Sequence, residues 1–173
     1  MKKIVFLTLF FFFNIFLNAK SFAINNISFI DVDYIYSNSE VGKKINSDLS
    51  SKLDKINKEF SNYKKIIETE KDKINNQRNI ISEEEFKKKT IELDKKVKNF
   101  NSEISKKRKQ FETFKKDTYN SFLKELMNII KEYADKNSID LILKKENIII
   151  GKNNSDISDN ILELLNNKIK SIN

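Results

Sequence analysis

The chain has 173 residues, of which 33 are basic and 25 acidic, and its formal net charge is +8. It contains no cysteine and no histidine, which excludes a thiol nucleophile, an imidazole base, a disulfide and the usual zinc site. We therefore expect no enzyme, no catalytic residues, no metal site and no cofactor.

Residues 1–23 have the pattern of a cleaved secretory signal peptide. Lys2 and Lys3 precede an apolar run over residues 4–17, and the small residue Ala23 stands where a signal peptidase cuts. A transmembrane anchor is disfavoured, because fourteen helical residues reach only about 21 Å and a hydrocarbon core is about 30 Å thick. We expect an exported, soluble mature chain that begins near Ile24.

A short strand is predicted near residues 27–32, where β-branched and aromatic residues cluster. Asp31 and Asp33 follow, and we interpret them as helix caps or hub contacts, not as a carboxylate pair for acid–base chemistry. Gly42 lies near the start of the next helix, where it costs about 1 kcal/mol relative to alanine. Close backbone packing is the better explanation for this glycine than a ligand.

Two long segments carry apolar residues at alternating spacings of three and four, which is the seam of a coiled coil. The seam positions are Leu53, Ile56, Phe60, Tyr63, Ile67, Glu70 and Ile74, and then Phe86, Thr90, Leu93, Val97, Phe100, Ile104, Lys107, Phe111 and Phe114. Between the two runs, Ser82 and Glu85 form a capping box. This pattern predicts two helices joined by a tip near residues 79–82.

The two seams also match each other when the chain folds back on itself. Facing residues then have numbers that add to about 160, as for Phe60 with Phe100 and Ile67 with Leu93. A single continuous helix in a parallel coiled coil is the rival, and the capping box and the matched seams disfavour it. We expect an antiparallel hairpin about 58 Å tall over residues 41–119.

The C-terminal part has strand character again. Residues 139–143 and 148–151 read as a β-hairpin with a four-residue turn, apolar on both faces. Ser158 is predicted to cap a closing helix near residues 159–171. Residues 24–40 and 120–173 would then form one small hub. Such a hub is too small for a good core of its own, so it should oligomerise while the arms project.

The chain resembles a known family, the Skp (OmpH) periplasmic chaperones, in a series of weak motifs that follow the same order. They are Ile27-x-x-Ile30-Asp31-x-x-x-Ile35-x-x-x-Ser39-x-x-Gly42-Lys43, then residues 81–85, residues 139–143, Gly151 and Asp156-Ile157-Ser158. The resemblance implies an α+β, mostly α fold: a long antiparallel helical hairpin arm that projects from a small β-rich trimerisation hub. It further implies a periplasmic homotrimer, three arms around a client cavity, and an ATP-independent holdase for unfolded outer-membrane β-barrel proteins.

The charge is concentrated on the distal arm. Residues 64–110 carry fifteen basic and nine acidic groups, so the net positive charge of the mature chain lies there. Such a field would attract acidic clients and anionic lipid or lipopolysaccharide surfaces. The alternative for any single lysine is a solvated helix face. The expected client- and anion-binding residues are Lys87, Lys88, Lys89, Lys95, Lys106, Lys107, Arg108, Lys109, Ile66 and Ile91.

Seam aromatics are interpreted as core, which leaves client contact to off-seam residues such as Ile66, Ile91 and Tyr119. The expected hub and trimer core consists of Ile27, Phe29, Ile30, Val32, Leu141, Ile142, Leu143, Ile148, Ile149 and Ile150. Two other functions stay open. One is a structural coiled-coil protein of the cell envelope without clients. A nucleic-acid binder is weaker, because export removes the chain from the genome and Arg78 and Arg108 alone could make bidentate contacts outside the signal segment.

Overall fold

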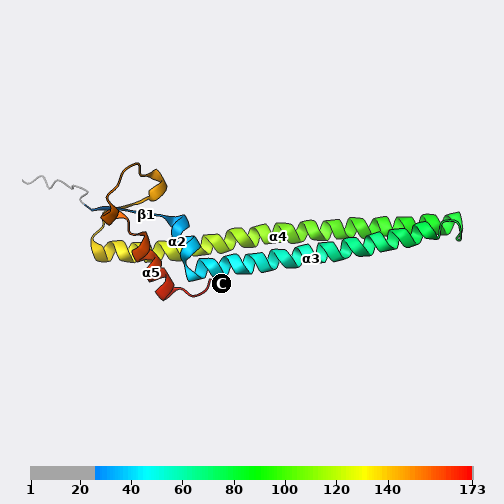
Figure 1. The fold of residues 1–173 in the computed structure, drawn as a ribbon, viewed down its shortest axis with the longest axis horizontal. Coiled ribbons are helices and arrows are strands. Elements are labelled where there is room, and N and C mark those ends of the chain that lie inside the picture. Colours follow the sequence, from blue (N-terminus) through cyan, green and yellow to red (C-terminus); the bar gives the residue numbers. More distant parts are fainter. Residues whose placement is uncertain (1–25, 173) are drawn as a thin grey trace, which may run out of the picture.

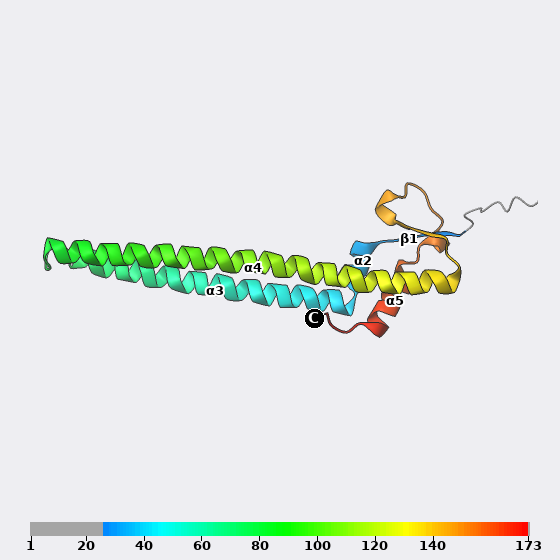
Figure 2. The ribbon, with the colours of Figure 1, turned by 180° about the vertical axis from the view of Figure 1, so that it is seen from behind.

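The computed structural model describes residues 26–172, and its main feature is one long hairpin of two helices that projects from a small hub. Figures 1 and 2 show both helices running the full length of the arm, with all other elements gathered at one end. The signal peptide predicted over residues 1–23 lies outside the described residues. No helix within residues 26–172 combines the length and the apolar character needed to cross a membrane.

The chain enters the hub through strand β1 (Ile27–Ile30) and the short helix α2 (Val32–Asn38). Asp31 ends the strand and caps α2, because its carboxylate accepts a hydrogen bond of 2.9 Å from the Tyr34 backbone N–H. This confirms the cap interpretation of Asp31. The strand is two residues shorter than predicted, since the cap turns the chain before Val32 can continue it.

Helix α3 (Glu40–Asn76) starts at a tight junction with α2. The Ser39 hydroxyl accepts a hydrogen bond from the Gly42 backbone N–H and donates one to the Tyr36 carbonyl. A Cβ atom on Gly42 would lie 1.8 Å from that carbonyl oxygen. Glycine is therefore required because the backbone of α2 occupies the space that any side chain would need.

Helix α4 (Glu83–Asn137) begins where the sequence predicts, with Ser82 as its N-cap. The Ser82 hydroxyl accepts a hydrogen bond from the Glu85 backbone N–H, and three glutamates in the first turn suit the positive end of the helix dipole. The tip spans residues 77–82. The helix does not end near residue 119 but continues through the hub to Asn137. One continuous helix therefore belongs to both the arm and the hub.

The seam of the arm is confirmed by burial. Within residues 64–110 every seam position except Lys107 is buried or half-buried, with Ile74, Leu93 and Ile104 buried. Nearer the hub, Leu53 and Phe60 are exposed on the seam. Phe60 and Phe100 lie against each other, with ring centroids 5.9 Å apart, as the predicted register requires. The helices thus meet along the narrow stripe that the three–four spacing defines.

The predicted β-hairpin in the hub is wrong. Strand β2 (Leu141–Lys144) pairs in parallel with β1, with Ile27 opposite Leu141. Residues 148–151 form no strand. Lys145–Asn147 is a 3₁₀ turn (η2) closed by a hydrogen bond from the Ile148 N–H. The other edge of β1 is occupied by a bridge between Phe29 and Asp156.

The closing helix α5 (Ser158–Lys168) follows a second 3₁₀ turn, η3 (Asn153–Ser155). Ser158 is its first residue and not its cap: the Ser158 backbone N–H donates to the Asp156 carboxylate. The Ser158 hydroxyl instead accepts a hydrogen bond of 2.9 Å from the Asp31 backbone N–H. The serine therefore joins the end of β1 to the start of α5.

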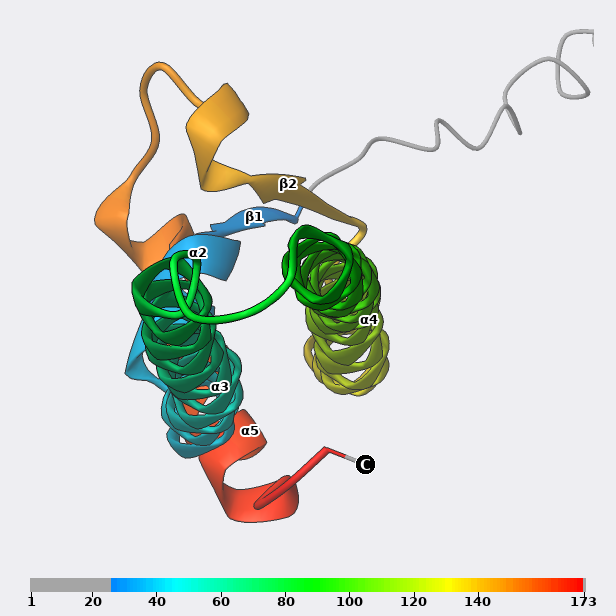
Figure 3. The ribbon, with the colours of Figure 1, turned by 90° about the vertical axis from the view of Figure 1, so that its right-hand side faces the viewer.

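The hub core lies between α2, the base of α3, the far end of α4 and α5. Figure 3 shows these helices end-on. Phe122, Ile35, Leu126, Ile161 and Leu165 are its largest fully buried side chains. Of the predicted core residues, Phe29 and Ile30 are buried, and Val32, Ile142, Leu143 and Ile148 are half-buried. Four others are exposed in the single chain: Ile27, Leu141, Ile149 and Ile150.

Candidate functional site

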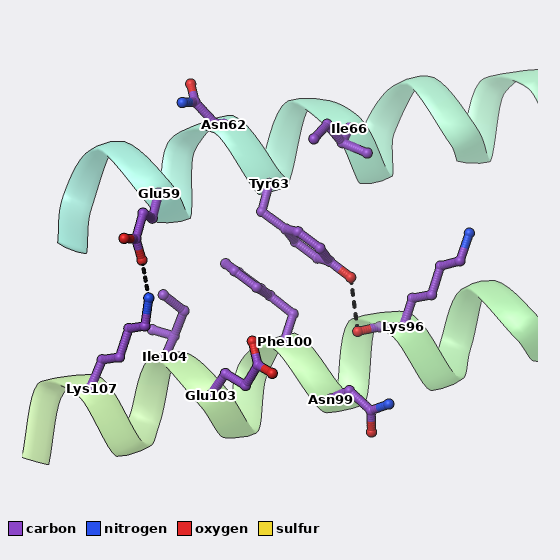
Figure 4. A pocket seen from close by; sticks show the side chains of 10 residues that line it. All are labelled: Glu59, Asn62, Tyr63, Ile66, Lys96, Asn99, Phe100, Glu103, Ile104 and Lys107. Carbon is purple, nitrogen blue, oxygen red and sulfur yellow. Dashed lines mark hydrogen bonds and ion pairs between the residues drawn. The ribbon is translucent and has the colours of Figure 1, made fainter. Parts of the chain in front are cut away.

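A hollow of about 500 Å³ lies halfway along the arm, between α3 and α4. Figure 4 shows it from close by, with Tyr63 and Phe100 pointing toward each other between the helices. Ile66 borders both this hollow and a second one that extends toward the tip along α3. The arm surface is therefore not smooth, and these two hollows lie on the same edge of the seam.

The floor of the hollow is aromatic. The Tyr63 and Phe100 rings stack with centroids 3.6 Å apart and planes inclined by 13°. The Tyr63 hydroxyl donates a hydrogen bond of 2.9 Å to the Lys96 backbone carbonyl, which ties α3 to α4. Both aromatic side chains are half-buried, so the rings hold the helices together and still offer apolar surface to the hollow.

Polar links between the helices border the hollow at both ends. Lys107 pairs with Glu59 on the hub side, as Figure 4 shows, and Lys96 pairs with Glu70 on the tip side. Further out, the Lys89 ammonium donates to the Gln77 side-chain oxygen. The hydrogen bond to Glu70 raises the pKa of Lys96 above its usual value. Lys96 and Lys107 thus have carboxylate partners on the other helix, and Lys89 has one on its own helix, Glu85, at 3.4 Å.

The predicted apolar contacts divide between the arm and the hub. Ile66 has 58% of its surface exposed and Ile91 44%, so both are accessible on the arm. Tyr119 is half-buried in the hub instead, where it packs edge-on against Tyr36 at 5.4 Å. Tyr119 is therefore less accessible than Ile66 and Ile91, because Tyr36 of α2 packs against it.

The predicted cations fall into two groups. Lys89 and Lys107 are paired across the seam, and the Arg108 guanidinium lies 5.8 Å from the centre of the Phe60 ring. Within residues 26–172 the remaining five make no ion pair: Lys87, Lys88, Lys95, Lys106 and Lys109. Runs of lysine in the sequence therefore mix cations that are paired with cations that are not.

A second exposed apolar surface lies on the hub. Ile149 and Ile150 expose 98% and 90% of their surfaces on the loop after β2. The loop packs closely against the Phe29 ring at Gly151. Only glycine allows this approach, because a Cβ there would lie 2.6 Å from the ring. Lys145 pairs with Asp156 at 2.7 Å across the base of the loop. The two isoleucines thus point outward from an anchored loop.

Asp156 is the polar centre of that anchor. Burial by itself would raise the pKa of its carboxyl, but hydrogen bonds from Lys145 and Ser158 outweigh burial and lower the pKa below its ordinary value. The same contact raises the pKa of Lys145. Sequence reasoning identified Asp156 only as part of a family motif and missed its role.

Within residues 26–172 no three His, Cys, Asp or Glu side chains are grouped so as to hold a metal ion. The arm offers exposed apolar side chains, satisfied ion pairs and free cations. Such a surface is suited to reversible, non-covalent binding.

A family profile described as "Outer membrane protein (OmpH-like)" matches residues 26–165. A candidate outer membrane chaperone (OmpH-like) from Caulobacter crescentus, solved as a crystal structure, has the same fold, with a TM-score of 0.82 at 16% identity. That match covers 88% of this chain and 90% of the other. No curated protein matches the chain at a significant level.

Proposed function

The chain belongs to the family of OmpH-like outer membrane proteins, and from this premise we propose that it is an ATP-independent holdase chaperone in the periplasm. Its clients would be unfolded outer-membrane β-barrel proteins, held soluble until they insert. Membership of the family supports a chaperone role in general. The surface of the arm supports the finer proposal.

The observation that carries the proposal is the exposed apolar surface beside the aromatic hollow. Ile66 is 58% exposed at a place where Tyr63 and Phe100 form an apolar floor. Isolated exposed apolar residues are ordinary, but a hollow that gathers several of them can receive a client's side chain. Each such contact is weak, so a client bound through many of them can leave without ATP.

The cationic balance of the arm supports capture over longer distances. Residues 64–110 carry an excess of six positive charges, and most of their lysines are exposed. A field of this sign attracts acidic chains and speeds their association at low salt. Anionic lipid and lipopolysaccharide surfaces would be attracted in the same way, and we include them as secondary partners.

A homotrimer is part of the proposal, and the hub supports it. Ile149 and Ile150 expose nearly all their surface, and the free edge of β2 beside them carries the exposed Leu141. Exposed edges and large apolar side chains favour association of the hub with further copies. Three hubs joined through this surface would place three arms side by side.

The proposal is tested with the mature chain, residues 24–173. A urea-unfolded β-barrel membrane protein is diluted with and without it, and the fraction that stays soluble is measured by centrifugation. We expect clear protection at stoichiometric amounts of trimer. Ile66→Asp should weaken protection, because it places a charge beside the apolar hollow. Ser102→Asp adds the same charge on the exposed outer side of α4 and should not.

Absence of protection by the parent chain would contradict the holdase function. It would favour the alternative of a structural coiled-coil protein that spaces the layers of the envelope. Equal loss in both variants would show that added negative charge is responsible, and not the apolar hollow.

A further inference from the structure

The two edges of the arm differ in whether their charged side chains have partners on the other helix. One edge, which we call the ladder edge, carries the links Glu59–Lys107, Glu70–Lys96 and Gln77–Lys89. In each link one partner directly precedes a seam position, namely Glu59, Lys96 and Lys89. Residues that directly follow seam positions lie on the opposite side of each helix. The seam therefore separates two rows of side chains.

The opposite row, which we call the cationic edge, repeats every seven residues on both helices. It contains residues 57, 64 and 71 on α3, residue 78 in the tip, and residues 87, 94, 101 and 108 on α4. Five of these eight are cations and one is an anion, Asp94. The cations are Lys64, Lys71, Arg78, Lys87 and Arg108.

No ion pair joins α3 to α4 along the cationic edge, within the part of the chain that the structure describes. Lys64 has a loose contact of 3.9 Å with Glu68 on its own helix, and both side chains are about two-thirds exposed. Arg78 and Arg108 lie over seam rings of the neighbouring helix instead, at 5.5 Å from Phe86 and 5.8 Å from Phe60. Three lysines of the ladder edge, in contrast, have carboxylate or amide partners across the arm: Lys89, Lys96 and Lys107.

We propose that the cationic edge is the site at which the arm binds the carboxylates of an extended, acidic polypeptide segment. This inference rests on the proposed holdase function and assigns its electrostatic part to particular residues. An unpaired cation can exchange water for a ligand's carboxylate, whereas a lysine already paired within the arm must first lose a partner.

The spacing of the row fits a chain. Seven residues of helix advance about 10.5 Å, so Lys64 and Lys71 lie one such level apart on α3, and Arg78 follows them at the tip. An extended polypeptide advances about 3.3 Å per residue, so every third residue can meet a new level. A flat membrane surface met by the tip would reach only Arg78 and Lys87, which is why we favour a polypeptide over lipid.

The edge also offers apolar surface beside its charges. Ile91, which is 44% exposed, lies one helical turn from Lys87. Phe60 and Phe86 lie beneath the two guanidinium groups. A segment that alternates acidic and apolar residues could therefore use both kinds of contact at once.

The test compares two triple variants of the mature chain with the same change in net charge. Lys64→Glu, Lys71→Glu and Lys87→Glu alter the cationic edge. Lys65→Glu, Lys88→Glu and Lys95→Glu alter the exposed outer face, each one residue beyond a cationic-edge position. Capture of a urea-unfolded β-barrel protein of net negative charge is followed by stopped-flow fluorescence. Binding to phosphatidylglycerol vesicles is measured in parallel by co-sedimentation.

At low salt we expect the cationic-edge variant to capture about fivefold more slowly than the outer-face variant. The difference should vanish at 1 M salt, where the Debye length is about 3 Å. Equal rates for the two variants at low salt would overturn the inference in favour of a diffuse field. Loss of vesicle binding with unchanged capture would overturn it in favour of lipid. A parent chain that keeps no client soluble would contradict the proposed function itself, and the inference with it.

Discussion

Tyr63 on α3 and Phe100 on α4 lie face to face across the arm, with ring centroids 3.6 Å apart. The Tyr63 hydroxyl also donates a hydrogen bond to the Lys96 carbonyl. We expect Tyr63→Ala and Phe100→Ala each to destabilise the arm, with a coupling energy of about 1 kcal/mol between them. Urea unfolding followed by circular dichroism of both single variants and the double variant gives this coupling.

Tyr63→Phe separates the ring from the hydroxyl. It should retain the coupling to Phe100 and lose about 1 kcal/mol for the hydrogen bond alone. Additive effects of the two alanine variants would contradict a direct contact between the rings in solution.

The register of the arm can be tested by crosslinking. Cysteines that replace Phe60 and Phe100 should form a disulfide within one chain under mild oxidation, because these rings lie against each other. Cysteines at positions 60 and 104 should crosslink poorly, since they are displaced by one helical turn and disulfides tolerate Cα separations up to about 7 Å. Non-reducing electrophoresis of the oxidised variants measures both. If the displaced pair forms as readily, the arm has no fixed register.

Gly42→Ala should destabilise the hub although alanine is the better helix former. The added Cβ would lie 1.8 Å from the Tyr36 carbonyl oxygen, so α2 and α3 would have to move apart. We expect a loss of about 2 kcal/mol or more in thermal or urea unfolding, against the gain of about 1 kcal/mol that the exchange brings in an open helix. Ser47→Ala, at an exposed position of α3, is the control and should be neutral or stabilising. A stabilised Gly42→Ala chain would show that the junction is looser than described.

Asp156 gives the hub a defined response to acid. Its pKa is lowered in the folded chain below the ordinary value of 3.8, so its contribution is complete above that value and is lost as the pH falls through the folded-state pKa. Asp156→Asn should cost about 2 kcal/mol at pH 7, because hydrogen bonds to a charged group are lost. The difference from the parent should shrink progressively below about pH 4. Melting curves from pH 3 to pH 7 test this, and a difference that does not depend on pH would contradict a role for the charge.

The exposed isoleucines of the hub are expected to hold the trimer together. Ile149→Asp with Ile150→Asp should then shift the chain to a monomer in light scattering at micromolar concentration. The parent should melt at higher temperature as its concentration rises, because association stabilises the folded state by mass action. Lys152→Asp, on the same exposed loop, controls for the added charge. A double variant that stays trimeric would place the interface elsewhere.

Local sequence signals predicted the arm well. The three–four spacing fixes which side chains face inward on a helix, and the least exposed residues of the arm follow it. Ser82 caps α4 as expected, because a cap depends on residues within one turn of the helix. Asp31 was identified as a cap for the same reason. Each of these features is decided by residues fewer than about eight positions apart.

The hub and the pairing of charges depended on the tertiary structure. β1 pairs with β2, which lies more than a hundred residues away, so no local pattern could tell this parallel pairing from the predicted hairpin over residues 139–151. Likewise, a lysine's neighbours in sequence do not show whether a carboxylate on the other helix reaches it. Lys89 and Lys107 have partners across the seam, whereas Lys87 and Lys109 have none among the described residues. The periodicity of the chain determined which side chains face the seam, and the offset between two packed helices decided which charges are left free, because that offset is a property of both helices together.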